Sequence, residues 1–408
     1  MSPTEKRNIK RILLYFLYPV IFLLRIIPRD KNIWMFGNFK GYIDNPKYLF
    51  EYLHNDKNND IEIYWLTRDK ELYKTLKNNN REVLYYYSFK GVWKSFRAGV
   101  SFLANGYSDV NKLAAINSFI VHFWHGTPIK KIFFDTELVI NFYSFGRLNG
   151  LLTRLNIKAT ELLNNKINIF LVSSDFELVR MKKAFRIKEK VFRITGTPRL
   201  EIIKGRANKQ LKIANVFDKY NTTNGKVIVY APSWRDKGWE LKQKIDTQQK
   251  LNVYLEKENA YFFIKRHPLT SVDELLSWGL VETERVIFIE DNFDINGAYQ
   301  FIDIIITDFS SVMFDYGMLN KPVLFFITDL EEYSNNRGFY DDIVEMSYSR
   351  INKDWDELLN SLEDLKKIDK INKFVKHPHF EYLLKNKFGK VREEIVALVK
   401  KEIEYAEN

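Results

Sequence analysis

Residues 303–311 read Asp-Ile-Ile-Ile-Thr-Asp-Phe-Ser-Ser, and this stretch decides the fold because it joins an apolar strand directly to polar residues and a helix. The residues that follow, 312–319, have the composition of a helix. Ser310 or Ser311 can cap that helix, whose free N–H groups and dipole then face an anion. Asp308 stands at the same strand end and can orient a ligand. Simple helix capping by serine explains these residues equally well.

The same rhythm of apolar runs and amphipathic stretches extends over most of the chain. Short runs typical of buried strands lie at 33–36, 61–66, 83–87, 101–104 and 119–124, and a second series lies at 226–230, 261–264, 285–288, 302–307 and 322–326. The stretches between them have helical spacing, as in βαβ units of a parallel sheet. Two such sheets in tandem predict an α/β fold with two Rossmann-like domains facing a cleft, where ligands bind at the carboxyl ends of strands.

Length and polar stretches predict the domain boundaries. The chain has 408 residues, which is too long for one ordinary core and suits two domains. The polar stretch 204–224 separates the two series of strands. We therefore expect a membrane-associating segment, two Rossmann-like domains and a set of charged C-terminal helices. Their expected bounds are 1–30, 31–205, 206–365 and 366–408.

Charge and composition limit the classes of partner and of chemistry. The formal net charge of +11 implies an anionic partner, which can be a nucleic acid, a phosphorylated substrate or an acidic membrane surface. The chain has no cysteine, so disulfides, thiolate zinc sites and cysteine nucleophiles are excluded. The sequence contains neither G-x-G-x-x-G nor a Walker-type loop, which argues against a nicotinamide enzyme and a P-loop NTPase. No nucleic-acid binding is expected, because the cations are scattered over strand ends instead of forming a stripe among stacking aromatics.

The N-terminus has the pattern of an interfacial membrane element. An uncharged run at 12–24 is too short to span a bilayer and is interrupted by Pro19. Basic residues flank it on both sides, unlike the residues around a secretory signal. They are Lys6, Arg7, Lys10, Arg11 and Arg25. We predict peripheral attachment to an anionic membrane surface, on the cytoplasmic face. A buried first helix of the N-terminal domain is the alternative.

A first candidate catalytic residue is His125. It follows an apolar strand and begins the segment His-Gly-Thr-Pro-Ile-Lys-Lys at 125–131, which turns into a helix started by proline. An imidazole titrates near neutral pH, so His125 can take a proton from an attacking hydroxyl. A histidine that only caps a loop is the alternative.

A second candidate lies at the end of an apolar strand, in Phe-Phe-Ile-Lys-Arg-His-Pro at 262–268. Its two cations and the histidine, Arg266 and His267 among them, suit a diphosphate because they stabilise charge on a leaving phosphate. A solvated basic loop explains the same residues.

Two further strand ends carry arginines that could clamp phosphate. Thr-Gly-Thr-Pro-Arg ends at Arg199, and Ala-Pro-Ser-Trp-Arg ends at Arg235. Surface ion pairing is the alternative for both. The sequence shows no closely spaced set of histidines and carboxylates, so we expect cations and helix termini to neutralise the diphosphate, with no metal and no cofactor.

Five motifs in this order closely resemble the CDP-glycerol glycerophosphotransferase family, the wall teichoic acid glycerol-phosphate primases and polymerases. They are His-Gly-Thr-Pro at 125–128, Gly-Thr-Pro-Arg at 196–199, Tyr-Ala-Pro-Ser-Trp-Arg at 230–235, Lys-Arg-His-Pro at 265–268 and Ile-Thr-Asp-Phe-Ser-Ser at 306–311. Further matches are Phe314-Asp315-Tyr316, Lys321-Pro322, Asp329, Tyr333 and Arg337-Gly338. The sequence departs from the family at Ser233, Phe309 and Glu201, where the family has Thr, Tyr and Asp.

The resemblance implies a glycosyltransferase-B-like fold, peripheral membrane attachment and release of CMP from CDP-glycerol. It implies that His125 and His267 are required for activity. It assigns an acceptor-binding role to the first domain and a CDP-glycerol-binding role to the second. The donor and phosphate set implied by the motifs is Arg199, Arg235, Arg266, Asp308, Ser310, Ser311, Thr127 and Pro232.

The function expected from this resemblance is transfer of glycerol phosphate from CDP-glycerol to a polyprenyl-diphosphate-linked disaccharide in teichoic acid synthesis. A short N-terminal region before the catalytic domains favours a primase over a polymerase. A glycerol- or ribitol-phosphate polymerase of a teichoic acid or capsule, and a nucleotide-sugar glycosyltransferase of the same fold, stay as alternatives. A non-catalytic basic membrane adaptor is the alternative from a different class. The oligomeric state is left open.

Overall fold

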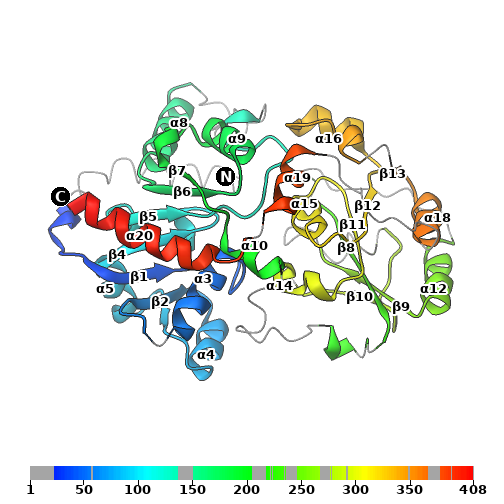
Figure 1. Ribbon diagram of the computed structural model, residues 1–408, viewed down its shortest axis with the longest axis horizontal. Coiled ribbons are helices and arrows are strands. Elements are labelled where there is room, and N and C mark those ends of the chain that lie inside the picture. The colour runs from blue at the N-terminus through cyan, green and yellow to red at the C-terminus, as the bar shows by residue number, and fades with distance from the viewer. Residues whose placement is uncertain are drawn as a thin grey trace. The chain divides into compact units, whose positions relative to one another are not determined.

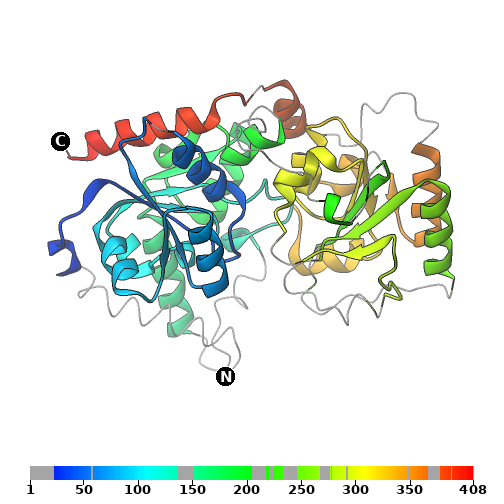
Figure 2. The ribbon, with the colours of Figure 1, turned by 90° about the horizontal axis from the view of Figure 1, so that it is seen from below.

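The structure is a computed structural model of the chain, and a ribbon of it is shown in Figures 1 and 2. It describes residues 23–56, 58–136, 150–204, 217–220, 222, 224–233, 235, 246–266, 276, 278–290, 293–347, 350–365, 377–386 and 388–407. The chain forms two compact units, each around its own parallel sheet. The α/β prediction, with two parallel sheets, is therefore confirmed.

The chain passes between the units more than once. The first unit contains residues up to His125, then Lys131–Glu201 and Phe388–Asn408. The second unit contains Gly126–Lys130 and Ile202–Lys387. Five consecutive residues directly after His125 thus belong to a different unit from the strand that precedes them. The predicted boundaries, which divide the chain linearly, do not include such returns.

In the first unit the described residues form one seven-stranded parallel sheet, in the order β3-β2-β1-β4-β5-β6-β7. The strands are β1 (Asp30–Phe36), β2 (Glu62–Thr67), β3 (Val83–Tyr85), β4 (Ala98–Leu103), β5 (Phe119–His122), β6 (Ile169–Val172) and β7 (Phe192–Ile194). Six of them follow the 3-2-1-4-5-6 order of a Rossmann fold, and β7 extends the sheet at one edge.

Helices cover both faces of this sheet, as α/β packing requires. Leu49 and Leu53 of α3 (Asp44–Asn55) and Ile395 of α20 (Val391–Glu407) pack on one face, along which α20 runs in Figure 1. Met181 and Phe185 of α9 (Asp175–Phe185) pack on the other. The remaining helices of this unit are α4 (Lys70–Asn78), α5 (Phe89–Arg97), α6 (Lys112–Ala115), α8 (Leu151–Asn164) and α10 (Pro198–Ile203), with short 3-10 turns that include η1 (Leu24–Ile26).

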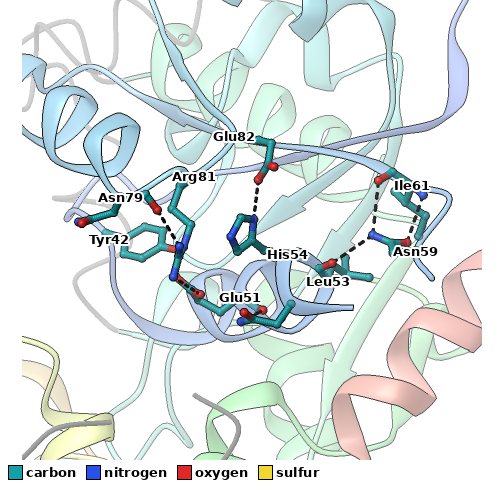
Figure 3. A network of polar contacts seen from close by, with 10 residues as sticks. Tyr42, Glu51, Leu53, His54, Asn59, Ile61, Asn79, Arg81 and Glu82 are labelled. Atoms are coloured by element: carbon teal, nitrogen blue, oxygen red, sulfur yellow. Dashed lines mark hydrogen bonds and ion pairs between the residues drawn. The ribbon is translucent and has the colours of Figure 1, made fainter. Parts of the chain in front are cut away.

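A polar network fixes α3 against the loop before β3 (Figure 3). Arg81 donates from Nε and Nη2 to the two carboxylate oxygens of Glu51, at 2.9 and 3.0 Å, and the Tyr42 hydroxyl donates to the same carboxylate. Burial alone would raise the pKa of Glu51, but the hydrogen bonds from Arg81 and Tyr42 outweigh it and lower that pKa. His54 Nδ1 lies 2.7 Å from Glu82 beside this cluster.

In the second unit the described residues form a six-stranded parallel sheet, in the order β10-β9-β8-β11-β12-β13. The strands are β8 (Lys226–Ala231), β9 (Ala260–Ile264), β10 (Val286–Phe288), β11 (Ile304–Thr307), β12 (Val323–Phe326) and β13 (Ile351–Asn352). This is again the 3-2-1-4-5-6 order, so both units have the Rossmann topology. The helices are α12 (Thr247–Lys257), α14 (Ile295–Ala298), α15 (Val312–Gly317), α16 (Leu330–Arg337), α17 (Ile343–Met346), α18 (Trp355–Asp364) and α19 (Pro378–Lys385). Leu255 of α12 and Leu358 of α18 pack with Trp355 over one face.

Most of the predicted N-terminal membrane segment lies outside the described residues, including Lys6, Arg7, Lys10 and Arg11. Arg25 is described: it is exposed in η1, and its Nε donates to Asn117 over 3.4 Å. Among the helices in the described part of the chain, none has the length and apolar composition needed to cross a bilayer.

Candidate active site

The first candidate region lies where β8 and β11 are neighbours in the second sheet. At this position of a 3-2-1-4-5-6 sheet the strand order reverses, and a crevice for a ligand forms outside the carboxyl ends of the strands. β8 ends at Ala231 and leads into buried Pro232 and Ser233, while β11 ends at Thr307 and leads into Asp308. Two of the predicted donor-binding segments are thus brought together.

Asp308 is the centre of this region and is fully buried. The backbone N–H of Ser233 donates to both oxygens of Asp308, at 2.9 and 3.0 Å. The same carboxylate pairs with Arg235, whose Nη1 lies 2.9 Å from Oδ2. Because a buried charge needs paired hydrogen-bonding partners, these contacts hold the β8 loop rigidly against the β11 loop. Asp308 therefore fixes the shape of the site.

Arg235 is held by carboxylates of its own unit. Its Nε and Nη2 donate to the two oxygens of Asp329, at 2.6 and 3.0 Å, and its Nη1 also donates to the Ser233 carbonyl at 2.6 Å. Burial alone would lower the pKa of Arg235, but the charges of Asp308 and Asp329 outweigh it and raise that pKa. The guanidinium also lies 4.7 Å from the ring centroid of Tyr333. In this arrangement Arg235 braces the site, because its donors are directed at protein groups.

The segment Gly126–Lys130 joins the same region. The β carbon of any residue at 126 would lie 2.4 Å from Ser311 Oγ, so the backbone of Gly126 packs directly on Ser311. Lys130 Nζ lies 3.4 Å from Ser233 Oγ and 5.7 Å from the ring centroid of Tyr333. The structure therefore brings together described residues of three motifs: Gly126 and Lys130, Ser233 and Arg235, and Asp308 and Ser311. His125, which precedes Gly126, belongs to the first unit.

Thr127, predicted to bind the donor, is buried and hydrogen-bonded to another side chain. Its Oγ1 lies 2.8 Å from Nε2 of buried His379, near the start of α19. The backbone N–H of His379 donates to Nδ1 of His377, whose Nε2 lies 3.2 Å from Asp341. Thr127 thus fixes the position of its segment. There was no reason in the sequence to select His379, because no sequence pattern distinguishes a buried histidine from an exposed one.

Ser310 and Ser311 lie at the start of α15, half-buried. Ser310 Oγ accepts from the N–H of Val312 at 3.4 Å, and Ser311, at the N-cap, makes no side-chain capping bond. The alternative that these serines serve only as helix caps is therefore weakly supported by the geometry. The Ser311 hydroxyl lies beside Gly126 at the strand end, where an anion would be expected.

The basic strand-end motif follows β9 as predicted. Lys265 and Arg266 are half-buried, and the N–H of Lys265 donates to the carbonyl of Tyr230 at 2.8 Å. β9 is the neighbour of β8, so these two cations lie on the same edge of the sheet as Asp308. His267, the second predicted catalytic histidine, lies outside the described residues.

The second candidate region lies in the first unit, at the end of β5. His125 is half-buried, with Nδ1 3.2 Å from the carbonyl oxygen of Ala104. A carbonyl only accepts, so Nδ1 carries the proton and Nε2 is left as the basic nitrogen. Burial lowers the pKa of His125 well below its ordinary value, and the charge of Lys40 acts in the same direction. The imidazole is therefore neutral and able to accept a proton.

The conformation before His125 is strained and held in place. Trp124 has φ of 58°, a left-handed value that is costly for a large side chain. Asn45 compensates by donating from Nδ2 to the carbonyl of Trp124 at 3.0 Å, and its Oδ1 accepts the N–H of Arg199 at 2.9 Å. Asn45 thus links the loop of His125 to Arg199. Sequence patterns could not indicate this residue, since an asparagine at the start of a helix is common.

Arg199 is buried, and its Nη1 donates to Thr197 at 3.1 Å. The predicted phosphate clamp therefore lies inside the first unit, and Arg199 contributes to the low pKa of His125 by its charge. Asp109, which the sequence did not single out, accepts backbone N–H groups of Phe39, Ala104 and Asn105. It orders the β1 and β4 loops around the Ala104 carbonyl that binds His125.

The described residues contain no group of three histidine, aspartate or glutamate side chains able to hold a metal ion. The positive groups of the first candidate region, at the ends of β8, β9 and β11, are lysine and arginine side chains. The arrangement suits a phosphorylated ligand at the ends of β8, β9 and β11, because lysines, hydroxyls and a helix start can all stabilise phosphate oxygens.

The sequence as a whole fits one known family. The sequence model of the CDP-glycerol:poly(glycerophosphate) glycerophosphotransferase family matches residues 19–401. The chain belongs to this glycerophosphotransferase family. The resemblance carried by the five motifs is thereby confirmed.

Glycerophosphotransferase relatives extend over nearly the whole chain. The teichoic acid poly(glycerol phosphate) polymerase of Bacillus spizizenii is 29% identical over 375 residues, which are 87% of this chain and 89% of that protein. The teichoic acid glycerol-phosphate transferase of Staphylococcus aureus is 27% identical over 372 residues, 88% of this chain and 90% of that protein. The solved structure of the wall teichoic acid polymerase TagF has a TM-score of 0.69 and 20% identity, and covers 100% of this chain and 99% of that one. The fold is therefore shared with this wall teichoic acid polymerase.

Proposed function

We propose that the chain transfers glycerol phosphate from CDP-glycerol to a lipid-linked acceptor, an undecaprenyl diphosphate disaccharide, in teichoic acid synthesis. CMP is the second product. The family match over residues 19–401 carries this proposal. It is supported by relatives that are named for glycerol phosphate transfer or polymerisation and that align with nearly all of the chain.

The second unit supplies the donor side. Half-buried Lys265 and Arg266 follow β9, and Lys130 and the Ser310–Ser311 hydroxyls lie at the ends of the neighbouring segments. These groups would hold the diphosphate and stabilise the charge on departing CMP, with His267 from the same motif as a further candidate. Arg235 and Asp308 would act by holding the loops, since each is paired to the other inside the protein.

His125 supplies the base. The acceptor hydroxyl gives its proton to Nε2 of His125 while its oxygen attacks the glycerol-side phosphorus of CDP-glycerol. The bond from that phosphorus to the bridging oxygen breaks, and CMP leaves with the bridging oxygen. The neutral state of His125 and its fixed tautomer suit this role. Gly126, the next residue, belongs to the donor-side unit, so one peptide bond joins base and donor segment.

The number of glycerol phosphate groups added to each acceptor is a separate question. The chain covers 89% of a relative named a polymerase and 90% of one named a glycerol-phosphate transferase, so length does not distinguish the two activities. We keep addition of one or a few units as the proposal and glycerol-phosphate polymerisation as the second candidate, which the Bacillus spizizenii relative favours.

The test is CMP release from CDP-glycerol with and without a disaccharide diphospholipid acceptor, followed by mass spectrometry of the lipid. Acceptor-dependent CMP with a gain of one glycerol phosphate establishes a primase, and a ladder establishes a polymerase. His125→Ala should abolish transfer and leave CDP-glycerol binding intact. His54→Ala is the matched control, because His54 lies at the Glu82 side of α3. Absence of CMP release with CDP-glycerol, but release from CDP-ribitol or a nucleotide sugar, would contradict the proposed donor.

A further inference from the structure

Helix α5 presents an apolar face to solvent. Phe89 is 86% exposed and Trp93 is 49% exposed, and Val92 beside them is exposed as well. These residues are separated by three and four positions, so they lie on one side of the helix. We call Phe89, Val92 and Trp93, together with Lys90, the α5 face. Such a set of exposed aromatic side chains marks an interaction surface more often than an isolated exposed residue does.

In an ordinary surface helix the large apolar residues face the protein, but those of the α5 face lie toward solvent. The residues that face the protein are the small ones, Gly91 and Ser95, which are both buried. A β carbon at 91 would lie 2.1 Å from the carbonyl oxygen of Tyr85, so the helix backbone packs directly on the end of β3. The buried Ser95 hydroxyl has a hydrogen-bond partner, since it donates to the Gly91 carbonyl at 2.7 Å. Packing thus explains the small residues, whereas the aromatic side chains of Phe89 and Trp93 stay exposed among the described residues.

The charges around the α5 face are basic. The helix contains Lys90, Lys94 and Arg97 and no acidic residue. Lys94 pairs with Glu62 at 2.6 Å, while Lys90 is exposed. An aromatic surface bordered by cations is complementary to a layer that is apolar inside and negatively charged at its surface. Trp and long basic side chains are well suited to the headgroup region, where an apolar body and a polar end are both stabilised.

The α5 face continues toward the N-terminal turn. Arg97 donates from Nη1 to the carbonyl of Pro28 at 2.7 Å, and Arg29 donates to the carbonyl of Ala98 at 2.7 Å. Two residues before Pro28, Ile26 is 80% exposed in η1, with Arg25 exposed beside it. The end of α5 and the turn η1 therefore form one fixed corner of the first unit, with exposed apolar and basic residues on both elements.

We propose that the α5 face docks on an anionic lipid bilayer, with Phe89 and Trp93 entering the headgroup layer and Lys90 contacting anionic headgroups. This surface is a folded part of the first unit and is distinct from the N-terminal segment predicted to associate with membranes. It gives the chain a second point of attachment, which would orient the first unit on the membrane. The proposal does not depend on the proposed function, since it requires no turnover.

The test uses the absence of cysteine from the chain. Phe89→Cys in the full chain is labelled with the environment-sensitive fluorophore NBD and mixed with vesicles of phosphatidylcholine, with or without phosphatidylglycerol. We expect a blue shift and quenching by spin-labelled lipid only when phosphatidylglycerol is present. Val253→Cys, at a position 59% exposed on α12 of the second unit, is the matched control and should show neither effect.

A second variant measures binding. Phe89→Ser combined with Trp93→Ser should lower partition into phosphatidylglycerol vesicles by at least about tenfold, because two aromatic side chains lose their burial in the headgroup layer. Phe89→Ser alone should have a smaller effect in the same direction and leaves the fold untouched, since Phe89 is almost fully exposed. Val253→Ser should leave partition unchanged.

Three outcomes overturn the proposal. In the first, the chain floats with vesicles while the label at 89 keeps its aqueous spectrum, which would place the attachment elsewhere. In the second, the chain does not float with vesicles. In the third, the label shifts without vesicles as protein concentration rises, which would show that a second copy covers the α5 face. CMP release measured with a detergent-dispersed acceptor separates each of these from a failure of the proposed function.

Discussion

Arg235 Nη1 lies 2.9 Å from Asp308 Oδ2, and this ion pair joins the loop after β8 to the loop after β11. Both partners are buried, and Asp308 also accepts the N–H of Ser233. The pair therefore holds the two loops that meet at the point where the strand order of the second sheet reverses.

Asp308→Asn should destabilise the second unit by about 3 kcal/mol, because a buried pair that loses one charge leaves the other uncompensated. Arg235 would keep its pair with Asp329. CMP release should fall as well, since the loops lose their fixed positions. Urea denaturation of the variant measures the change in unfolding free energy.

The control is Glu363→Gln, which breaks the exposed pair between Lys257 and Glu363. It should cost less than about 1 kcal/mol, as exposed pairs contribute little. Equal effects of the two substitutions would show that the Arg235–Asp308 pair is not the brace described above.

Gly126→Ala should reduce activity strongly, because of backbone strain and because of a steric clash. The strain arises because Gly126 has φ of 141°, and the clash because an added β carbon would lie 2.4 Å from Ser311 Oγ. Gly41→Ala measures the backbone strain alone, since Gly41 has φ of 119° and nothing within 4 Å of the added atom. The steric part should appear as the extra loss of stability in Gly126→Ala.

The double variant Gly126→Ala with Ser311→Gly removes the hydroxyl and the β carbon that the new methyl group meets. It should regain part of the lost stability, with a coupling of about 1 kcal/mol in a double-mutant cycle. Additive effects would mean that Gly126 and Ser311 do not pack together in solution.

The pH dependence of kcat/KM should reflect the low pKa of His125. Its imidazole is neutral in the free protein because burial and Lys40 disfavour the charged form. Protonation, which removes the base, therefore requires a pH below the ordinary range of histidine, so the acid limb should lie below about pH 6.5. Measuring CMP release with both substrates below saturation from pH 5 to 8 checks this, and an acid limb above pH 7 would contradict it.

Stability should fall in acid because of His122. Burial lowers the pKa of His122 to about 3, whereas the unfolded chain titrates near its ordinary value of about 6.5. Between these values the unfolded state binds the proton and the folded state does not, so stability is full above about pH 6.5 and decreases as pH falls. Lowering the pH from 6.5 to 5 should cost about 2 kcal/mol through this group.

His122→Asn tests the origin of this loss. Its amide oxygen can accept the Trp124 N–H that His122 Nδ1 accepts at 3.1 Å, and it does not titrate. Unfolding free energies at pH 7 and pH 5 should then differ by about 2 kcal/mol less in the variant than in the parent. A slope that stays the same would assign the acid sensitivity to other groups.

The strands could be predicted from sequence because buried parallel strands are short, continuous apolar runs, as residues 304–306 show. The order of the strands could not, since pairing between β1 and β4 or β8 and β11 joins residues far apart in the chain. The return of Gly126–Lys130 into the second unit has the same origin, because it depends on contacts with Ser311 and Tyr340.

The sequence motifs lie directly after strands, as predicted, because polar residues after an apolar run mark a strand end. The roles assigned to their side chains stay predictions. The motifs could not show that Arg235 faces Asp308 and Asp329, since sequence gives the charge of a side chain and not its partner. The α5 face shows the same limit: a period of 3.6 reveals an apolar stripe, and only the packing of Gly91 on Tyr85 shows that the stripe faces outward.

The return of α20 to the first unit bears on how the chain folds during synthesis. Val391, Ile395, Val399 and Ile403 fill the same core as Trp34 and Phe36, more than three hundred residues earlier in the sequence. On the ribosome, that face of the first sheet would be covered only in part, by α3, while the whole second unit emerges and folds. A nascent chain would thus expose an incomplete first core while residues 202–387 are made, and would need a chaperone or rapid synthesis to avoid aggregation there.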